Sequence, residues 1–337
     1  MFLQGFLIIA ENVAILFAMI ALGFAAAKSK YIREAEKAKD VISVLILKIT
    51  LPLLIVTSLM KNNLDADLIY NALTVVVITA VVVPLTFFAS WWIGRIFKIP
   101  KATLVVHSCL TAFGNVVFLG YPLLTALYGA EGLFYTAIYA MINDAFVYTM
   151  GIFLIAKHGT KHEGGVSLKR LINPLTVSFV VAVVLMAAKM GVVSYIAQSA
   201  GMPQAQAMVG DFTNAVFQPF ATIGHCTIPL AMLFIGFILA EVKLKNLVTP
   251  VTKFLPVLLK LIIVPVLMIL LLRPLGIAPI VMGVTVMQMA MPSQTMVSVF
   301  AREYGADSQY SAEGTFLSIL CSVATLPLIF KLLEIWV

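Results

Sequence analysis

The chain alternates between long apolar runs and short polar connections. A helix needs about 20 predominantly apolar residues to cross a bilayer, and ten runs reach about that length. They lie at roughly 6–27, 41–60, 70–93, 103–127, 132–156, 172–190, 220–240, 254–272, 278–300 and 313–333. The pattern therefore predicts an all-α membrane protein with ten transmembrane helices.

Lysine and arginine are distributed unevenly over the connections. Sixteen of them follow the odd-numbered runs, against four on the other side. Because basic loops stay in the cytoplasm, the odd-numbered loops are predicted to be cytoplasmic and both termini to lie outside. Trp91 and Trp92, just before Arg95, fit the aromatic belt at the cytoplasmic interface.

Two short sequences recur at nearly the same interval. Tyr128-Gly129-Ala130-Glu131 returns as Tyr304-Gly305-Ala306-Asp307 after 176 residues (304 − 128), and Thr50-Leu51-Pro52-Leu53 returns as Thr227-Ile228-Pro229-Leu230 after 177 (227 − 50). A shared offset between separate matches indicates that the chain holds two copies of one unit.

The number of runs in each copy decides how the copies are related. Five is odd, so the second copy enters the membrane from the side opposite to the first. The two halves are then inverted about an axis in the membrane plane, as in many secondary transporters. The predicted division is a first repeat at 1–157, a cytoplasmic linker at 158–170 and an inverted second repeat at 171–337.

Composition excludes a soluble protein, because 62% of the 337 residues are apolar and 11% are charged, against about a quarter charged in soluble domains. The basic cytoplasmic loops account for the net charge of +7, so no nucleic-acid partner is expected. The connections are too short for a catalytic domain and carry no nucleotide or zinc motif, so no enzyme, cofactor or metal is expected. Cys109, Cys226 and Cys321 lie in predicted spans and are expected to pack as small apolar residues.

Two of the runs contain residues that interrupt helices. The fourth run holds Gly114, Asn115, Gly120 and Pro122, and the ninth holds a second cluster. Proline removes a backbone hydrogen bond, and Gly and Asn let the chain leave helical geometry. At membrane depth a break is tolerated where it is buried in protein or lines a cavity, and its exposed amides can hold an anion. The residues of the second cluster are Gln288, Pro292, Ser293, Gln294 and Thr295.

The sequences around these breaks resemble a known family. Residues 114–129 (GNVVFLGYPLLTALYG) and 291–305 (MPSQTMVSVFAREYG) are similar to the two signature crossovers of the auxin efflux carrier family, which includes plant PIN auxin exporters and bacterial permeases such as malonate transporters. The resemblance covers the whole chain in span number, orientation and repeat order. It implies two five-span repeats in which broken helices 4 and 9 cross beside a site for organic anions.

The plant members carry a long hydrophilic segment between spans 5 and 6. Here only His158–Arg170 fills that place, which favours a bacterial-type permease, expected in the bacterial inner membrane. The candidate substrate-binding residues at the crossover are Gly114, Asn115, Pro122, Gln288, Pro292, Ser293 and Gln294.

Asp144 lies near the centre of the fifth run, where a carboxylate is costly and commonly functional. It is the candidate coupling residue, which would bind a proton or a sodium ion, and a capped structural aspartate is the alternative. Lys48 and His225 are related by the 177-residue offset (225 − 48) and could attract an anion. The alternative is that Lys48 extends to the cytoplasmic surface and His225 is packed.

Two further expectations concern single features. Lys260, within two turns of the cytoplasmic end of the eighth run, is expected to extend its side chain to that surface. Residues 195–218 are too polar for a span, because they include Gly201, Pro203, Asp211 and Asn214, and are expected to form an interfacial helix.

The predicted function is a secondary transporter, or permease, that moves small organic anions by alternating access. The alternatives are a sodium-coupled organic-anion symporter of the bile-acid type and a non-transporting membrane receptor. A channel would need a continuous polar pore, and a membrane hydrolase would need a nucleophile that the runs do not supply. The expected partners are the anion, membrane lipids and a proton or sodium ion, and the choice between monomer and homodimer stays open.

Overall fold

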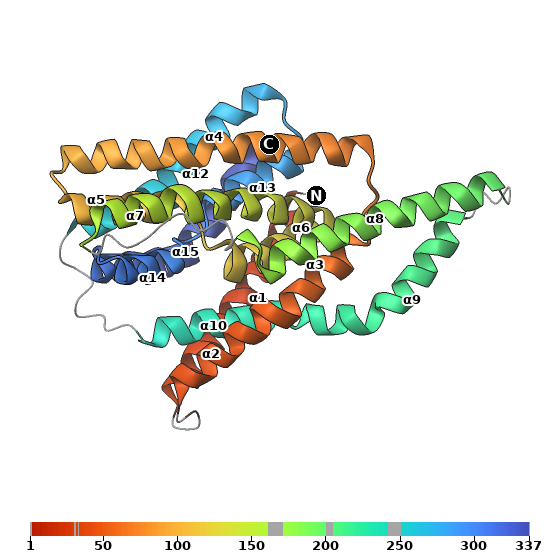
Figure 1. The fold of residues 1–337 in the computed structure, drawn as a ribbon, viewed down its shortest axis with the longest axis horizontal. Coiled ribbons are helices and arrows are strands. Elements are labelled where there is room, and N and C mark those ends of the chain that lie inside the picture. The colour runs from red at the N-terminus through yellow and green to blue at the C-terminus, as the bar shows by residue number, and fades with distance from the viewer. Residues whose placement is uncertain are drawn as a thin grey trace.

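The computed structural model describes residues 2–29, 32, 34–160, 171–199, 205–241 and 251–336, and the regular structure in these ranges is helical (Figure 1). The α-helices are α1 (Phe2–Lys28), α2 (Ala35–Leu45), α3 (Leu51–Leu59), α4 (Ala66–Ile96), α5 (Lys101–Ala112), α6 (Tyr121–Phe146), α7 (Ile152–His158), α8 (Pro174–Ser199), α9 (Ala205–His225), α10 (Thr227–Glu241), α11 (Phe254–Leu258), α12 (Val264–Leu272), α13 (Pro279–Met289), α14 (Met296–Glu303) and α15 (Ser308–Trp336). Short π-helical turns link several of them: η1 (Ile46–Thr50), η2 (Val116–Gly120), η3 (Val147–Gly151) and η7 (Leu259–Ile263). Two 3₁₀ turns, η6 (Val251–Lys253) and η8 (Arg273–Leu275), flank the α11–α12 segment.

Seven helical stretches in these ranges are long and apolar enough to cross a membrane. The all-helical membrane class is therefore confirmed, whereas the count of ten spans stays a prediction. The shorter apolar helices Ala14–Lys28 and Pro279–Met289 fall within two of the remaining expected spans. The seven stretches are Glu36–Leu59, Ala66–Ile96, Val116–His158, Pro174–Ile196, Met208–Ala240, Phe254–Leu275 and Ser308–Trp336.

One face of α4 exposes large apolar side chains. Large apolar side chains recur every three or four residues along one face of this helix and are exposed, which is the pattern of a surface in contact with lipid. The face carries Tyr70, Leu73, Val77, Val81, Leu85, Phe88, Trp92 and Ile96. The opposite face, with Val75, Val83 and Phe87, is buried against the rest of the protein.

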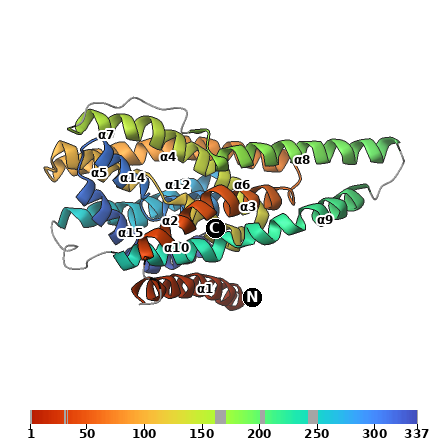
Figure 2. The ribbon, with the colours of Figure 1, turned by 60° about the horizontal axis from the view of Figure 1, so that its bottom comes forward.

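The helices form two groups. In the first group, α1 packs along α10, and α3 packs against α8 and α9, with α2 beside α10. In the second group, α4 packs against α5 and α6, α13 against α6 and α12, and α15 against α5, α11 and α14. Figures 1 and 2 show the two groups side by side, with α1 at the edge of the first. Both broken runs belong to the second group.

Glycine allows α1 and α10 to approach closely. A Cβ atom at Gly23 would lie 2.5 Å from the carbonyl oxygen of Leu233, and one at Gly236 would lie 2.3 Å from that of Ile20. Small residues at a helix interface let backbones touch in this way, which favours packing where lipid surrounds the helices.

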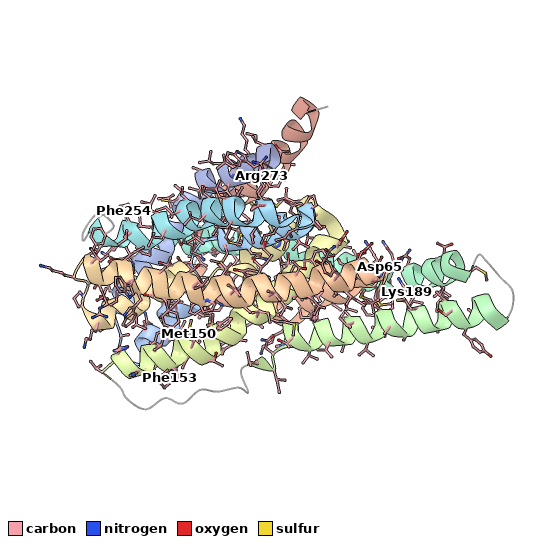
Figure 3. All side chains as sticks on the ribbon, turned by 90° about the horizontal axis from the view of Figure 1, so that it is seen from above. Asp65, Met150, Phe153, Lys189, Phe254 and Arg273 are labelled. Atoms are coloured by element: carbon pink, nitrogen blue, oxygen red, sulfur yellow. The ribbon has the colours of Figure 1, made fainter. Side chains whose placement is uncertain are left out.

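The expectation of one helix over 195–218 is wrong in its bounds, because residues 195–199 end α8 and residues 205–218 belong to α9, which leads into α10. α8 extends to Ser199, and α9 carries Asp211 and Asn214 into a single apolar stretch, Met208–Ala240, interrupted only by a turn at Cys226. Figures 1 and 3 show α8 and α9 reaching well beyond the other helices at one end. Gly201 and Pro203 lie outside the described residues. The polarity of this segment reflects its position at the end of long helices.

The glycines of two recurring tetrapeptides both have a positive φ. Gly129 and Gly305 have φ values of 63° and 71°, and of the described residues only Lys98 and Gly276 also have positive φ. Gly129 divides α6 into two helical arms, and Gly305 lies in the turn between α14 and α15. Glycine is required at both positions because other residues are strained at positive φ.

Candidate functional site

Two extended segments cross where the broken runs meet. α5 ends at Ala112 and α13 ends at Met289, and beyond them Gly114 and Ser293 form an isolated antiparallel bridge. The amide of Asn115 donates to the carbonyl of Pro292 at 2.7 Å, and the amide of Gln294 donates to the carbonyl of Phe113 at 3.1 Å. The two breaks therefore satisfy each other's backbone groups, as buried polar groups require.

Glycine at 114 permits the two breaks to meet this closely. A Cβ atom there would lie 3.0 Å from the carbonyl oxygen of Gln288, so a larger residue would press on the end of α13. Pro292 has no amide hydrogen and disfavours helical geometry at Met291. Pro122, in contrast, lies in the first turn of α6, where proline is well tolerated, and is buried.

Ser293 fastens the crossing point to two neighbouring helices. Its amide donates to Ser318 Oγ of α15 at 2.9 Å, and its own Oγ donates to the carbonyl of Leu110 in α5 at 2.7 Å. Both polar groups of the residue are thus paired with protein atoms. Ser293 therefore holds the crossover together.

The amide side chains around the crossover are buried and only partly paired. Asn115 Oδ1 accepts from the amide of Phe118 at 3.4 Å, which caps η2, but Asn115 Nδ2 has no partner among the described residues. The same is true of Gln294 Oε1 and of both polar atoms of Gln288. An unpaired buried polar group costs roughly 1–3 kcal/mol, so these groups retain hydrogen-bonding capacity in a closed part of the protein.

The side chain of Gln288 packs against Gly120, where any larger residue would collide with it. A Cβ atom at Gly120 would lie 2.7 Å from Gln288 Oε1 and 3.2 Å from its Nε2. The amide of Gln288, from the second half of the chain, thus rests directly on the backbone of η2 in the first half. Both polar atoms of this side chain stay within the crossover.

Asp144 is linked to the crossover through Gln294. Its Oδ1 lies 3.5 Å from Gln294 Nε2 and 3.4 Å from Asn143 Nδ2. Asn143 is itself buried, and its Oδ1 has no partner in the described part of the chain. The carboxylate predicted to carry coupling therefore lies next to an amide predicted to bind substrate, although the two are 150 residues apart.

The expectation that Lys260 extends to the membrane surface is wrong. Its side chain is fully buried in η7, and Nζ donates to the carbonyl of Thr111 at 3.3 Å. Nζ would also lie 3.7 Å from a Cβ atom at Gly114. Thr111 belongs to the last turn of α5, where the helix dipole is negative, so the ammonium group offsets that end of the broken helix.

Lys48 and His225 occupy a different setting. Lys48 lies in η1 and His225 ends α9, both in the first helix group, and both side chains are exposed. In the described residues, no hydrogen bond or ion pair connects either of them to the crossover. Beside them, α3 and α9 pack closely: a Cβ atom at Gly224 would lie 2.7 Å from the backbone nitrogen of Leu54.

Sequence reasoning missed three participants at this site: Lys260, Asn143 and Gly120. The lone charge within an otherwise apolar eighth run was the available signal for Lys260. Gly120 was recognised only as a residue that interrupts the fourth run, and nothing in the sequence distinguished Asn143; their contacts here depend on the packing of α6 and η2. No cluster of three or more metal-ligating side chains occurs among the described residues.

A helical membrane fold with two interlocked broken helices and a buried, partly unpaired polar cluster fits a membrane transporter, and a family match shows that class. The sequence profile of the membrane transport protein family matches residues 8–330, nearly the whole chain. The chain belongs to this family, which is the auxin efflux carrier family that the crossover motifs predicted. No curated protein matches the chain closely.

Proposed function

We propose that the protein is a secondary transporter that moves small organic anions by alternating access, with the crossover as the substrate site. The observation that carries this proposal is the set of buried, unpaired amide groups at the crossover, together with the buried ammonium of Lys260. Such a cluster can bind a small polar ligand in a region from which lipid and bulk water are excluded.

The unpaired donors of the cluster favour an anion, with the carboxylate of Asp144 set to one side of them beside Gln294. Asn115 Nδ2 and Gln288 Nε2 are unpaired donors, and Lys260 contributes a positive charge. The half-helices that begin at η2 and at α14 (Met296–Glu303) start beside the crossover, so their positive ends point toward it. A carboxylate fits this environment because it accepts several hydrogen bonds at once.

We further propose that the chain forms two inverted five-span repeats. The shared positive φ of Gly129 and Gly305, at the 176-residue offset, supports this division, as does the meeting of one break from each half at Gly114 and Ser293. The ten spans would include α1 and the two broken helices besides the longer stretches. Repeats at 1–157 and 171–337 would flank a linker at 158–170, of which 161–170 lies outside the described residues.

The coupling role of Asp144 remains part of the proposal. Protonation of this carboxylate would weaken or redirect its contact with Gln294 and so connect proton binding to the substrate site. Sodium coupling is a second candidate, because Asn143 Oδ1 and Gln294 Oε1 are unpaired oxygens of side chains that contact the Asp144 carboxylate, and hard cations bind such oxygens.

Counterflow in proteoliposomes tests the function. Vesicles loaded with an unlabelled dicarboxylate such as malonate should accumulate the labelled compound transiently, and Asn115→Ala should reduce that accumulation. Screening several carboxylates by thermal shift beforehand would select the substrate, because a bound ligand raises the melting temperature. Binding without counterflow would instead favour a receptor, and accumulation that requires sodium would favour the sodium-coupled symporter.

A further inference from the structure

A second polar site lies at the predicted cytoplasmic end of the second helix group, away from the crossover. It is a cavity of about 420 Å³ between the end of α4, the beginning of α5 and the end of α7. Arg95, Lys98, Lys101 and His158 line it, and no acidic residue does. Ile99 and Leu104, both buried, form its apolar floor.

The turn between α4 and α5 is held rigidly. The amide of Ile99 donates to the carbonyl of Gly94 at 3.1 Å, and the amide of Lys98 donates to the carbonyl of Arg95 at 3.0 Å. This pair of bonds is the Schellman pattern that ends many helices. A Cβ atom at Gly94 would lie 2.4 Å from Leu104, so α4 and α5 are also in close contact here.

Lys98 occupies the position in this turn where glycine is usual. Its φ is 56°, and it is the only residue other than glycine with positive φ in the described part of the chain. A side chain in this conformation is strained, and such strain is found where a side chain has a function. Here the strained conformation delivers the Lys98 side chain to the rim of the basic cavity.

His158 and Trp91 form the opposite wall. Their ring centroids are 5.4 Å apart, and the end of α7 is tied to the α14–α15 turn by the amide of Thr160, which donates to the carbonyl of Gly305 at 3.2 Å. The cavity walls are therefore preformed on three helices. Arg95, Lys98 and Lys101 are exposed, and no ion pair with another described residue neutralises them.

Lys98 also lines a second cavity, which contains acidic residues. This cavity has a volume of about 510 Å³ and is lined by Asp307 and Glu313 among others. Both are engaged: Asp307 accepts hydrogen bonds from Thr103 and from the amide of Tyr310, and Glu313 pairs with Lys253. Asp307 keeps its charge, but Arg95, Lys98 and Lys101 outnumber it, so the basic cavity has a net positive charge.

The apolar face of α4 leads directly to this cavity. Phe88, Trp92 and Ile96 are exposed on the last turns of the helix, beside Arg95. Figure 3 shows Phe153 of α7 at the edge of the molecule, and this side chain is likewise exposed. A basic pocket that continues into a lipid-facing apolar surface matches a molecule with an anionic head and acyl chains.

We propose that this cavity, hereafter the α4–α5 basic pocket, binds the headgroup of an anionic phospholipid of the cytoplasmic leaflet, with its acyl chains along α4. Basic pockets between transmembrane helices on the cytoplasmic side bind such headgroups. Arg95, Lys98 and Lys101 contact the phosphate, and Trp91 lies at the level of the headgroup.

The test uses the full-length protein in dodecyl maltoside. Dioleoyl phosphatidylglycerol should raise the melting temperature and give lipid adducts in native mass spectrometry, whereas dioleoyl phosphatidylcholine should do neither. Arg95→Gln combined with Lys101→Gln should weaken phosphatidylglycerol binding about 30-fold, since each basic residue near an anionic surface contributes roughly fivefold. The matched control, Lys28→Gln with Arg302→Gln, removes two exposed charges from the same predicted side and should bind normally.

The variant Lys98→Gly should change lipid binding and stability in opposite directions. Glycine relieves the positive-φ strain, so the lipid-free variant should melt at a higher temperature than the wild type, yet it should bind phosphatidylglycerol more weakly. Protection by inorganic phosphate equal to that by the lipid would overturn the proposal in favour of a free anion. Unchanged phosphatidylglycerol affinity in both the double variant and Lys98→Gly would overturn it outright.

Discussion

Lys260 Nζ donates a hydrogen bond to the carbonyl of Thr111 at 3.3 Å, which places a buried ammonium group at the end of a broken helix 149 residues away in sequence. The carbonyls at a helix end have no partners within the helix, and at membrane depth water is not available to replace them. Lys260 therefore stabilises the break that follows α5 from a segment distant in the sequence.

Replacement of Lys260 by Met should abolish counterflow of the anionic substrate while the protein still folds. Methionine preserves the volume of the side chain but removes the charge, and a hydrogen bond from a charged group contributes about 1.5–3 kcal/mol. Removal of a buried charge also eliminates its desolvation cost, so the melting temperature should change little. Lys253→Met serves as the comparison, because it breaks the Glu313 pair and should lower stability more. Normal counterflow in Lys260→Met would remove this residue from the site.

Asn115→Ala and Gln294→Ala should each weaken substrate binding by roughly tenfold or more. Asn115→Ala removes the unpaired donor Nδ2 at the crossover, and Gln294→Ala removes Nε2, the donor that contacts Asp144 at 3.5 Å. A hydrogen bond to a charged ligand contributes about 1.5–3 kcal/mol. Binding is measured by thermal shift or isothermal titration with the carboxylate chosen from the screen. Asn214→Ala and Gln218→Ala, on exposed positions of α9, are the controls. Unaltered affinity in both crossover variants would contradict the assignment.

Asp144→Asn should abolish the pH dependence of net uptake but preserve substrate exchange. Asparagine imitates the protonated carboxyl, and exchange does not require a proton to be released. Both activities are measured in the same vesicles across a pH range, and Asp211→Asn, an exposed carboxylate on α9, is the control. A variant with the wild-type pH profile would identify Asp144 as a structural residue and favour facilitated diffusion.

Gly129→Ala should destabilise the protein by about 1–3 kcal/mol. Its φ of 63° and ψ of −146° are accessible almost only to glycine, and no atom lies within 4 Å of the added methyl group, so the cost is purely conformational. Gly191→Ala in α8 also meets no neighbouring atom and, at a helical position, should be neutral or stabilising. Thermal unfolding in detergent compares the two. Equal melting temperatures would show that alanine is tolerated at position 129 without strain.

Cysteine accessibility tests the proposed orientation. In a background without Cys109, Cys226 and Cys321, Lys61→Cys should react with an impermeant maleimide added outside intact cells, and Lys101→Cys should react only after the cells are opened. The expectation follows from the distribution of basic residues. The reverse labelling pattern would invert the topology.

The sequence predicted the parts of the fold that depend on local pattern. The breaks near Gly114 and Pro292 follow from residues that cannot continue a helix, and the offset between Gly129 and Gly305 is matched by their shared positive φ. The helical membrane class follows equally from hydropathy. These features are properties of single segments, so no knowledge of packing is required to find them.

Other features depend on how segments pack, and these were missed. Lys260 looked like a residue close to the membrane surface, because hydropathy gives its depth along one helix and says nothing of the helices around it. Only the packing of η7 against α5 shows that its amine reaches Thr111. The contact between Asp144 and Gln294 joins α6 to the second break and was likewise beyond any local pattern. The polar segment around Asp211 misled in the opposite way, because polarity alone does not distinguish a helix lying in the interface from the end of a long one.

One aromatic contact joins the two helix groups at the crossover. The rings of Phe118 in η2 and Phe234 in α10 are 4.2 Å apart, and both are buried. Under the alternating-access mechanism proposed above, movement of the crossover along α10 would have to separate these rings, and the lost contact would add to the activation barrier. A leucine at either position would then lower that barrier without touching the amide cluster. The pair would influence the speed of turnover, independently of the polar residues proposed to select the substrate.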